Sequence, residues 1–125
     1  MSEQLTIDWK SVKQKAGPYT PEAFQFVRDG LSHTVRVSRG ADDAESRHVS
    51  GQELCFGLKD YAIKRYGMLA RTVLERWGIR RTDDFGRIVF AMVDLGLMRK
   101  TEEDSERDFS DVYSFDEAFD GVESV

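Results

Sequence analysis

Apolar residues recur at every third or fourth position through most of the chain, the spacing that lines one face of an α-helix. The pattern predicts a helix over 21–37 that begins with Thr20 as its capping residue and Pro21 in its first turn. A second, weaker row on the same helix consists of Phe26, Gly30, His33 and Val37. We therefore expect this helix to be covered on two sides.

Three more helices are predicted between Ser50 and Gly96, with tight glycine turns between them. Ser50 and Glu53 match the capping box, in which each side chain satisfies a backbone donor near the other residue. This is the sharpest local signal in the chain. The next helix runs from about Leu69 to Trp77, and Thr82 is expected to cap the last one.

The regions outside these helices have weaker patterns. A short helix is predicted over 8–17, docked by Trp9, and a surface loop over 40–47. After Gly96 the residues of 97–101 and 109–115 favour two strands of a hairpin, with a charged turn between them. The same segment also fits an irregular acidic arm folded over the helices.

Length and composition limit the architecture to one domain. The chain has 125 residues, of which 40% are hydrophobic, enough for one core and too few for two independent domains. We expect a single, mainly α domain, with N-terminal helices in 1–40, a three-helix core in 48–96 and the hairpin or arm in 97–119. This order of elements resembles a winged helix-turn-helix domain.

Charge is distributed unevenly in a chain whose net charge is −5. The stretch 102–125 holds ten acids and one base, a net charge of −9, so the remaining residues carry +4. Between Lys59 and Arg81, seven bases stand against two acids, a net charge of +5. The acidic tail is therefore either solvated or in contact with a basic surface, which belongs to its own chain or to a partner.

No set of residues predicts catalysis, a metal or a cofactor. Cys55 lies on an apolar helix face, where a thiol is buried and inert, and His33 and His48 lack a nucleophile or a ligand at a suitable spacing. Glu53 and Glu75 have simpler roles, as a cap and as a surface acid near an arginine. The acidic run 104–108 lacks the glycine and the terminal Glu of a calcium loop. We expect a protein that is not an enzyme and holds no cofactor.

Aromatic residues are more numerous than a small core needs, and aromatics with arginine are typical of interface hot spots. We expect the chain to bind a protein partner or its own copy through the corner from Trp77 to Arg81 and through the acidic C-terminal segment. The contact residues expected at this corner are Trp77, Arg76, Arg80 and Arg81.

A nucleic-acid-binding protein of winged-helix type is the alternative. It would use a basic stripe formed by Lys64, Arg65, Arg71, Arg76, Arg80 and Arg81. Asp83 and Asp84 at the start of the third helix, and the acids of 102–104, oppose the usual docking mode because they would face phosphates. The stripe would have to bind from another side.

Five stretches carry a resemblance to a known family: 48–54 (HVSGQEL), 66–67 (YG), 71–79 (RTVLERWGI), 84–86 (DFG) and 100–105 (KTEEDS). Together they resemble a family of small bacterial proteins from planctomycetes and verrucomicrobia, over roughly 24–119. The family has no assigned activity, so the resemblance implies a bacterial cytoplasmic protein and no functional residue. The absence of a long apolar run and of a signal-peptide pattern also favours the cytoplasm over a membrane.

Overall fold

A computed structural model describes residues 2–3, 10, 14, 17–39 and 48–120 of the chain. The loop predicted over 40–47 lies outside the described residues, and so does most of the helix predicted over 8–17, including Trp9.

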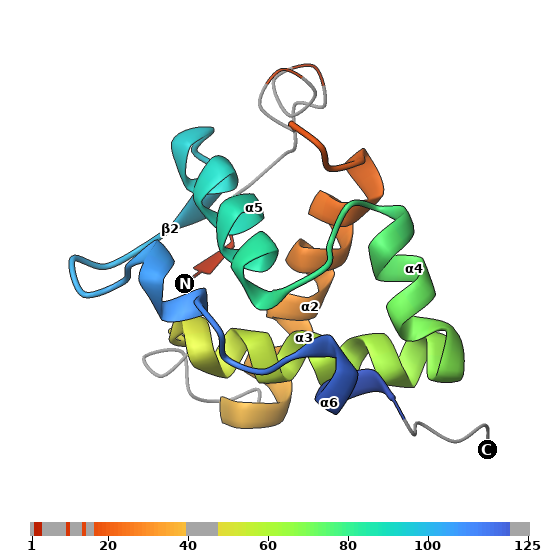
Figure 1. The fold of residues 1–125 in the computed structure, drawn as a ribbon. Coiled ribbons are helices and arrows are strands. Elements are labelled where there is room, and N and C mark those ends of the chain that lie inside the picture. Colours follow the sequence, from red (N-terminus) through yellow and green to blue (C-terminus); the bar gives the residue numbers. More distant parts are fainter. Residues whose placement is uncertain (1, 4–9, 11–13, 15–16, 40–47, 121–125) are drawn as a thin grey trace.

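The described chain is mainly helical, as the apolar spacing predicted (Figure 1). Within the described ranges lie five α-helices, two 3-10 turns and two very short strands. The elements are β1 (Ser2–Glu3), α2 (Pro21–Arg39), α3 (Gly51–Tyr66), η2 (Gly67–Leu69), α4 (Ala70–Arg76), α5 (Thr82–Asp94), β2 (Met98–Arg99), η3 (Glu106–Phe109) and α6 (Phe115–Phe119). The bounds of the four longest predicted helices agree with the sequence pattern to within a few residues.

The start of α3 is the capping box that the sequence predicted. The Ser50 hydroxyl accepts the backbone N–H of Glu53 at 3.1 Å, and the Glu53 carboxylate accepts that of Ser50 at 3.2 Å. Both bonds satisfy donors that a helix N-terminus otherwise leaves unpaired.

Two other predicted caps are wrong. Thr20 precedes α2, but its buried hydroxyl has no hydrogen-bond partner among the described residues. Thr82 is the first residue of α5 rather than its cap, and its buried hydroxyl donates to the carbonyl of Phe109 at 2.6 Å. The hydrogen bond to Phe109, 27 residues away in sequence, thus replaces the expected cap.

Asp84 caps α5 instead. Its Oδ2 accepts the backbone N–H groups of Arg80 and Arg81 at 2.8 and 3.1 Å, while its Oδ1 accepts from the Tyr19 hydroxyl and from the Arg87 guanidinium. The carboxylate is only 6% exposed, so these donors supply the solvation that it has lost. Asp84 therefore ties the start of α5 to the residues that precede α2.

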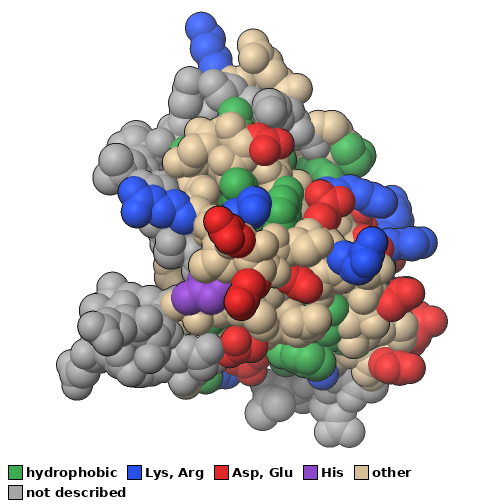
Figure 2. Space-filling model, turned by 90° about the vertical axis from the view of Figure 1, so that its left-hand side faces the viewer, with side chains coloured by type: hydrophobic (Ala, Val, Ile, Leu, Met, Phe, Trp, Pro, Cys, Tyr) green, Lys and Arg blue, Asp and Glu red, His purple; other side chains and the backbone are tan. Residues whose placement is uncertain are grey.

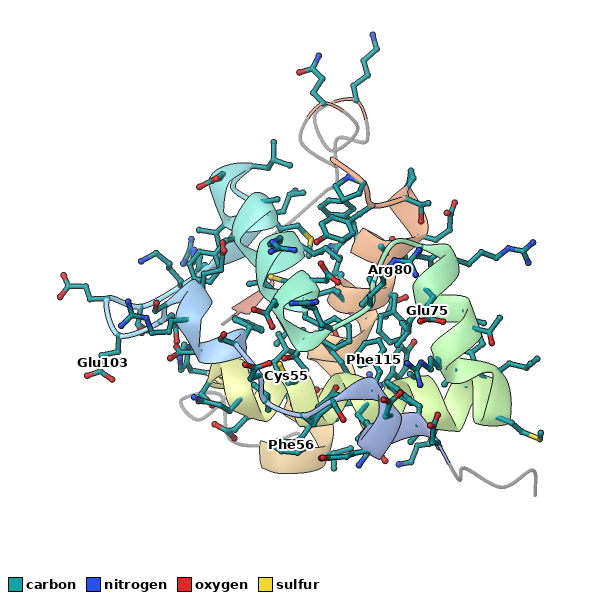
Figure 3. The ribbon with its side chains drawn as sticks, viewed as in Figure 1. Cys55, Phe56, Glu75, Arg80, Glu103 and Phe115 are labelled. Carbon is teal, nitrogen blue, oxygen red and sulfur yellow. The ribbon has the colours of Figure 1, made fainter. Side chains whose placement is uncertain are left out.

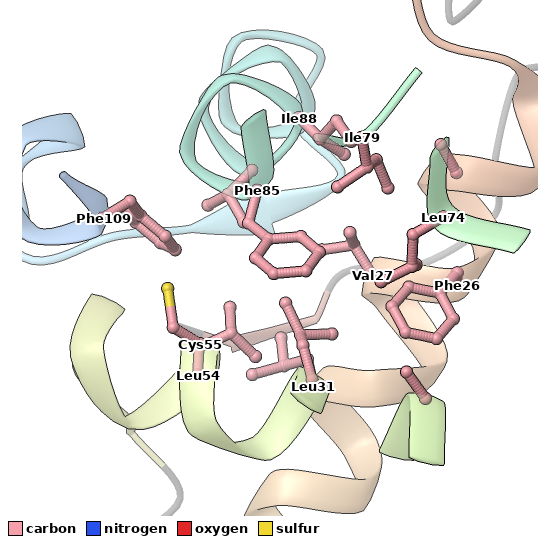
Figure 4. Packing of buried hydrophobic residues seen from close by; sticks show 14 of the residues in the cluster. Phe26, Val27, Leu31, Leu54, Cys55, Leu74, Ile79, Phe85, Ile88 and Phe109 are labelled. Carbon is pink, nitrogen blue, oxygen red and sulfur yellow. The ribbon is translucent and has the colours of Figure 1, made fainter. Parts of the chain in front are cut away.

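The core lies between α2, α3 and α5, with Leu74 of α4 at its edge (Figure 4). Phe24, Val27 and Leu31 of α2 are almost completely buried, as are Leu54, Cys55 and Leu58 of α3 and Phe85, Ile88 and Val89 of α5. Helix α2 packs against both α3 and α5. The core is therefore not confined to the three helices of 48–96, and the resemblance to a winged helix stays at the level of element order.

The predicted C-terminal hairpin is wrong. β2 pairs antiparallel with β1, with Met98 opposite Glu3, and the expected return strand is replaced by η3, an irregular stretch and the start of α6. The alternative of an arm folded over the helices describes this segment correctly. The reason is that its apolar side chains are buried individually against the helices instead of lining one face of a strand. Phe109 is fully buried, and Phe115 and Phe119 are nearly so.

Candidate binding cleft

An open cleft of about 200 Å³ lies where α2, the end of α3 and the end of α4 meet. Four residues on one face of α2, three residues of α3 and one residue after α4 form its walls. We call this site the aromatic cleft, and its lining residues are Glu22, Gln25, Phe26, Asp29, Tyr61, Arg65, Tyr66 and Trp77.

Four aromatic rings hold one another in place along the cleft. Phe26 is buried and contacts Tyr61 and Trp77, with ring centroids 5.5 and 5.7 Å away. The ring of Tyr66 meets that of Trp77 edge to face at 5.9 Å. Tyr61, Tyr66 and Trp77 are each partly exposed. Phe26 thus anchors a set of rings whose outer parts remain open to solvent.

The chain supplies one cation and two acids to this cleft. The Arg65 guanidinium lies 5.5 Å from the Tyr61 ring centroid and 5.7 Å from that of Tyr66, and it donates to the Tyr61 hydroxyl at 3.1 Å. The hydrogen bond with Tyr61 is the largest cause of a raised pKa for Arg65. The Asp29 carboxylate accepts a hydrogen bond from the Gln25 side-chain amide at 2.8 Å. Glu22 lies one helical turn before Gln25 on α2 and also lines the cleft.

The predicted corner is therefore only partly assembled around this cleft. Trp77 lies in it, but Arg76, at the end of α4, and Arg80 and Arg81, which follow the helix, do not line it; all three are exposed. Gly78 turns that chain with a positive φ of 92°, in close approach to the Pro18 carbonyl.

The basic stripe is partly neutralised by the chain itself. Arg71 binds Asp116 of α6 at 2.6 Å, Asp120 directly after α6 at 3.1 Å, and Glu75 at 3.6 Å. Lys64 pairs with Asp60 at 3.2 Å. The hypothesis that the acidic tail meets a basic surface of its own chain is thus realised at Arg71, while the three arginines from Arg76 to Arg81 remain exposed.

Acidic side chains gather at the other end of the molecule, where Figure 2 shows them beside a histidine. Asp104 is buried and accepts the backbone N–H of Thr101 at 2.8 Å, and its other oxygen lies 3.3 Å from Nε2 of His48. Asp108 closes a capping box with Ser105. Within the described residues, no group of three or more His, Cys, Asp or Glu side chains is arranged to hold a metal ion.

The residues weighed for catalysis occupy structural positions. Cys55 points into the core while the neighbouring Phe56 points outward (Figure 3), and burial raises the pKa of the Cys55 thiol to about 12. His33 bonds to Asp60 at 2.8 Å, which is the main cause of a lowered pKa for that acid. Glu53 is a cap and Glu75 pairs with Arg71.

Sequence reasoning missed most of the cleft. Phe26 belongs to the weaker second row predicted for its helix. Glu22 fits a first-turn acid of that helix, and Asp29 carried no signal except its spacing with Phe26 on α2. The second row was the available clue, because a helix covered on two sides has neighbours on both.

Comparison with protein-family models, curated proteins and solved structures found no match. The resemblance to the planctomycete and verrucomicrobial family stays a prediction. Among the helices of the described part of the chain, none is long and apolar enough to cross a membrane.

Proposed function

We propose that the chain is a non-enzymatic protein-binding module whose contact surface is the aromatic cleft around Trp77. The partner is another protein or a second copy of the chain. The observation that carries this proposal is the set of partly exposed rings of Tyr61, Tyr66 and Trp77. The buried ring of Phe26 contacts Tyr61 and Trp77, and Arg65 borders the set. Large rings fixed before binding lose little conformational entropy on contact, which is one reason why they dominate interface energetics.

The acidic C-terminal segment has a smaller part in this proposal than the sequence suggested. Asp116 and Asp120 bind Arg71 of the same chain, and Phe115 and Phe119 are buried. A partner that used this segment would have to compete with contacts already made. No described segment of the chain covers the cleft, and the Arg65 side chain at its mouth is exposed.

Nucleic-acid binding remains the second candidate because Arg76, Arg80 and Arg81 are exposed within six residues. Three arginines together attract phosphate, with an affinity that falls steeply as salt rises. The start of α5, which a winged helix would insert into the major groove, is less suited: Thr82 bonds to Phe109, and Asp83 lies 3.4 Å from Ser110 Oγ.

Capture from the host lysate, with and without nuclease, tests the two candidates. The baits are the tagged wild type, Trp77→Ala, Tyr66→Ala and the matched control Phe56→Ala, which removes an aromatic ring that is 54% exposed outside the cleft. Circular dichroism establishes that each bait is folded. A photo-crosslinker at position 66 or at position 56 then locates the contact.

The proposal expects proteins that survive nuclease, are retained by Phe56→Ala, are lost with both cleft variants and crosslink from position 66. If the partner is a second copy of the chain, the captured protein is the chain itself. Sedimentation should then show an oligomer of the wild type that Trp77→Ala dissociates. Partners lost on nuclease treatment would overturn the proposal in favour of nucleic acid. Partners retained equally by all baits would also overturn it.

We also propose the cytoplasm as the place of action. The one cysteine of the chain is a buried thiol with no second cysteine to pair with, which suits a reducing compartment.

A further inference from the structure

We infer that the aromatic cleft accepts an arginine side chain from an extended segment of the partner, in the place that Arg65 now occupies at its mouth. This inference rests on the proposed function and names the chemistry that the cleft recognises.

The shape of the cleft favours one side chain over a complete small molecule. Its volume is about 200 Å³, below the roughly 300–1,000 Å³ of sites that enclose drug-sized ligands. It is open to solvent on one side, so a side chain enters while the backbone that carries it stays outside. Three helix segments converge around it and fix its width.

The rings give the cleft a preference for cations. The face of an aromatic ring carries a partial negative charge that attracts ammonium and guanidinium groups within about 6 Å of its centre. Arg65 already shows this preference within the chain, at 5.5 Å from Tyr61 and 5.7 Å from Tyr66. Its side chain is exposed, so the guanidinium lies at the mouth of the cleft, where a competing cation can reach the same rings.

The acids of α2 add charge complementarity. Glu22 and Asp29 are two turns apart on the helix face that lines the cleft, on either side of Phe26. A guanidinium entering between them and the rings gains stacking on one side and carboxylate acceptors on the other. Arginine suits this combination better than lysine, because its planar group stacks on rings and donates in a fixed fork.

The resident Arg65 also limits the apolar surface that the cleft exposes to water when no partner is bound. Arg65 covers the rings of Tyr61 and Tyr66 in the free protein, which reduces the exposed apolar surface. Its removal should therefore help a competing arginine. This consequence separates the inference from a general attraction between an acidic protein and a basic probe.

The test is a titration followed by the NMR signals of the Trp77 indole N–H and of the Tyr61 and Tyr66 rings. The probes are N-acetyl-arginine amide, its neutral isostere N-acetyl-citrulline amide, and N-acetyl-lysine amide with a free side-chain amine. We expect weak, saturable binding of the arginine probe, with citrulline roughly tenfold weaker and lysine in between. Equal shifts with arginine and citrulline, or no shifts at these rings, would overturn the inference.

Matched variants locate the effect. Arg65→Gln removes the resident cation and should tighten arginine binding a few-fold, whereas Arg76→Gln, at an exposed arginine that does not line the cleft, should leave it unchanged. Asp29→Asn should weaken it. If Arg65→Gln and Arg76→Gln raise the affinity for the arginine probe equally, the effect is one of net charge. That result would refute the replacement of Arg65 by the probe.

The outcomes also separate this inference from the proposed function. If capture depends on Trp77 while arginine and citrulline probes bind alike, the protein-binding proposal stands and the arginine inference falls. If capture is independent of Trp77 and Tyr66, both fall.

Discussion

Two aromatic clusters of this small protein have opposite relations to solvent. The cluster of the C-terminal segment, which we call the closing cluster, consists of Phe109, Tyr113, Phe115 and Phe119 and packs onto α3 and α5. The aromatic cleft has a similar ring content and similar ring spacings, but no described segment of the chain covers it. Ring content alone therefore does not separate core from surface; the path of the chain does.

The closing cluster is fixed by backbone contacts as well as by rings. Phe109 lies so close to Gly51 and Gly86 that a Cβ at either glycine would come within 3 Å of it. Its carbonyl accepts the Thr82 hydroxyl, and the Tyr113 hydroxyl donates to the Cys55 carbonyl at 2.7 Å. Burial raises the pKa of Tyr113 well above its usual range. In the cleft, by contrast, Tyr61, Tyr66 and Trp77 are each partly exposed.

Deletion of residues 102–125 tests whether the closing cluster is part of the core, and it should have the largest effect on stability. The truncation removes Phe109, Phe115 and Phe119, each a buried ring whose loss costs roughly 3–5 kcal/mol, against a total stability of about 5–15 kcal/mol. We expect a chain that no longer unfolds cooperatively, measured by thermal melting. The control Glu102→Gln with Glu103→Gln reduces the acidic charge and keeps the rings, and it should melt like the wild type. An unchanged melting temperature after truncation would contradict the closing role.

Single ring deletions measure the same difference at one position in each cluster. Phe109→Ala should cost about 3–5 kcal/mol of unfolding free energy, because Phe109 is fully buried. Tyr66→Ala should cost only about 1–2 kcal/mol, since its ring is partly exposed. Urea denaturation of both variants gives the two values. Equal costs would mean that the cleft is part of the core.

Alkaline pH tests the buried hydrogen bond between Tyr19 and Asp84. Burial and then the hydrogen bond to Asp84 raise the pKa of Tyr19 from 10.0 to about 12. Between these values the folded protein retains a proton that the unfolded chain has lost, so the free energy of unfolding should fall as pH rises through this window. Denaturation of wild type and Tyr19→Phe at several pH values measures the slope. The same slope in both proteins would show that Tyr19 does not contribute.

The ion pairs of α6 should have the smallest effect. Arg71 binds Asp116 and Asp120, but both acids are largely exposed, at 76% and 65%. Exposed ion pairs contribute little because water and salt screen them, so Arg71→Ala should lower the melting temperature only slightly, and less still at high salt. Thermal melting at low and high salt measures it. A large, salt-independent loss would show that Arg71 fixes α6 by packing rather than by charge.

Local signals in the sequence determined the helices. The capping box at Ser50, the apolar spacing of α2, α3 and α5, and the place of Cys55 on an apolar helix face all follow from interactions within a few residues, and the structure confirms them. These features depend on helix geometry, which a single stretch of sequence specifies.

Tertiary structure decided everything that depends on a distant partner. Thr82 bonds to Phe109 instead of capping its helix, β2 pairs with β1 instead of with 109–115, and Arg71 binds α6. The aromatic cleft belongs to the same class, because its rings come from α2, α3 and the end of α4, which periodicity describes one at a time. Sequence spacing says which face of a helix is apolar, and only the packed chain decides whether that face is covered.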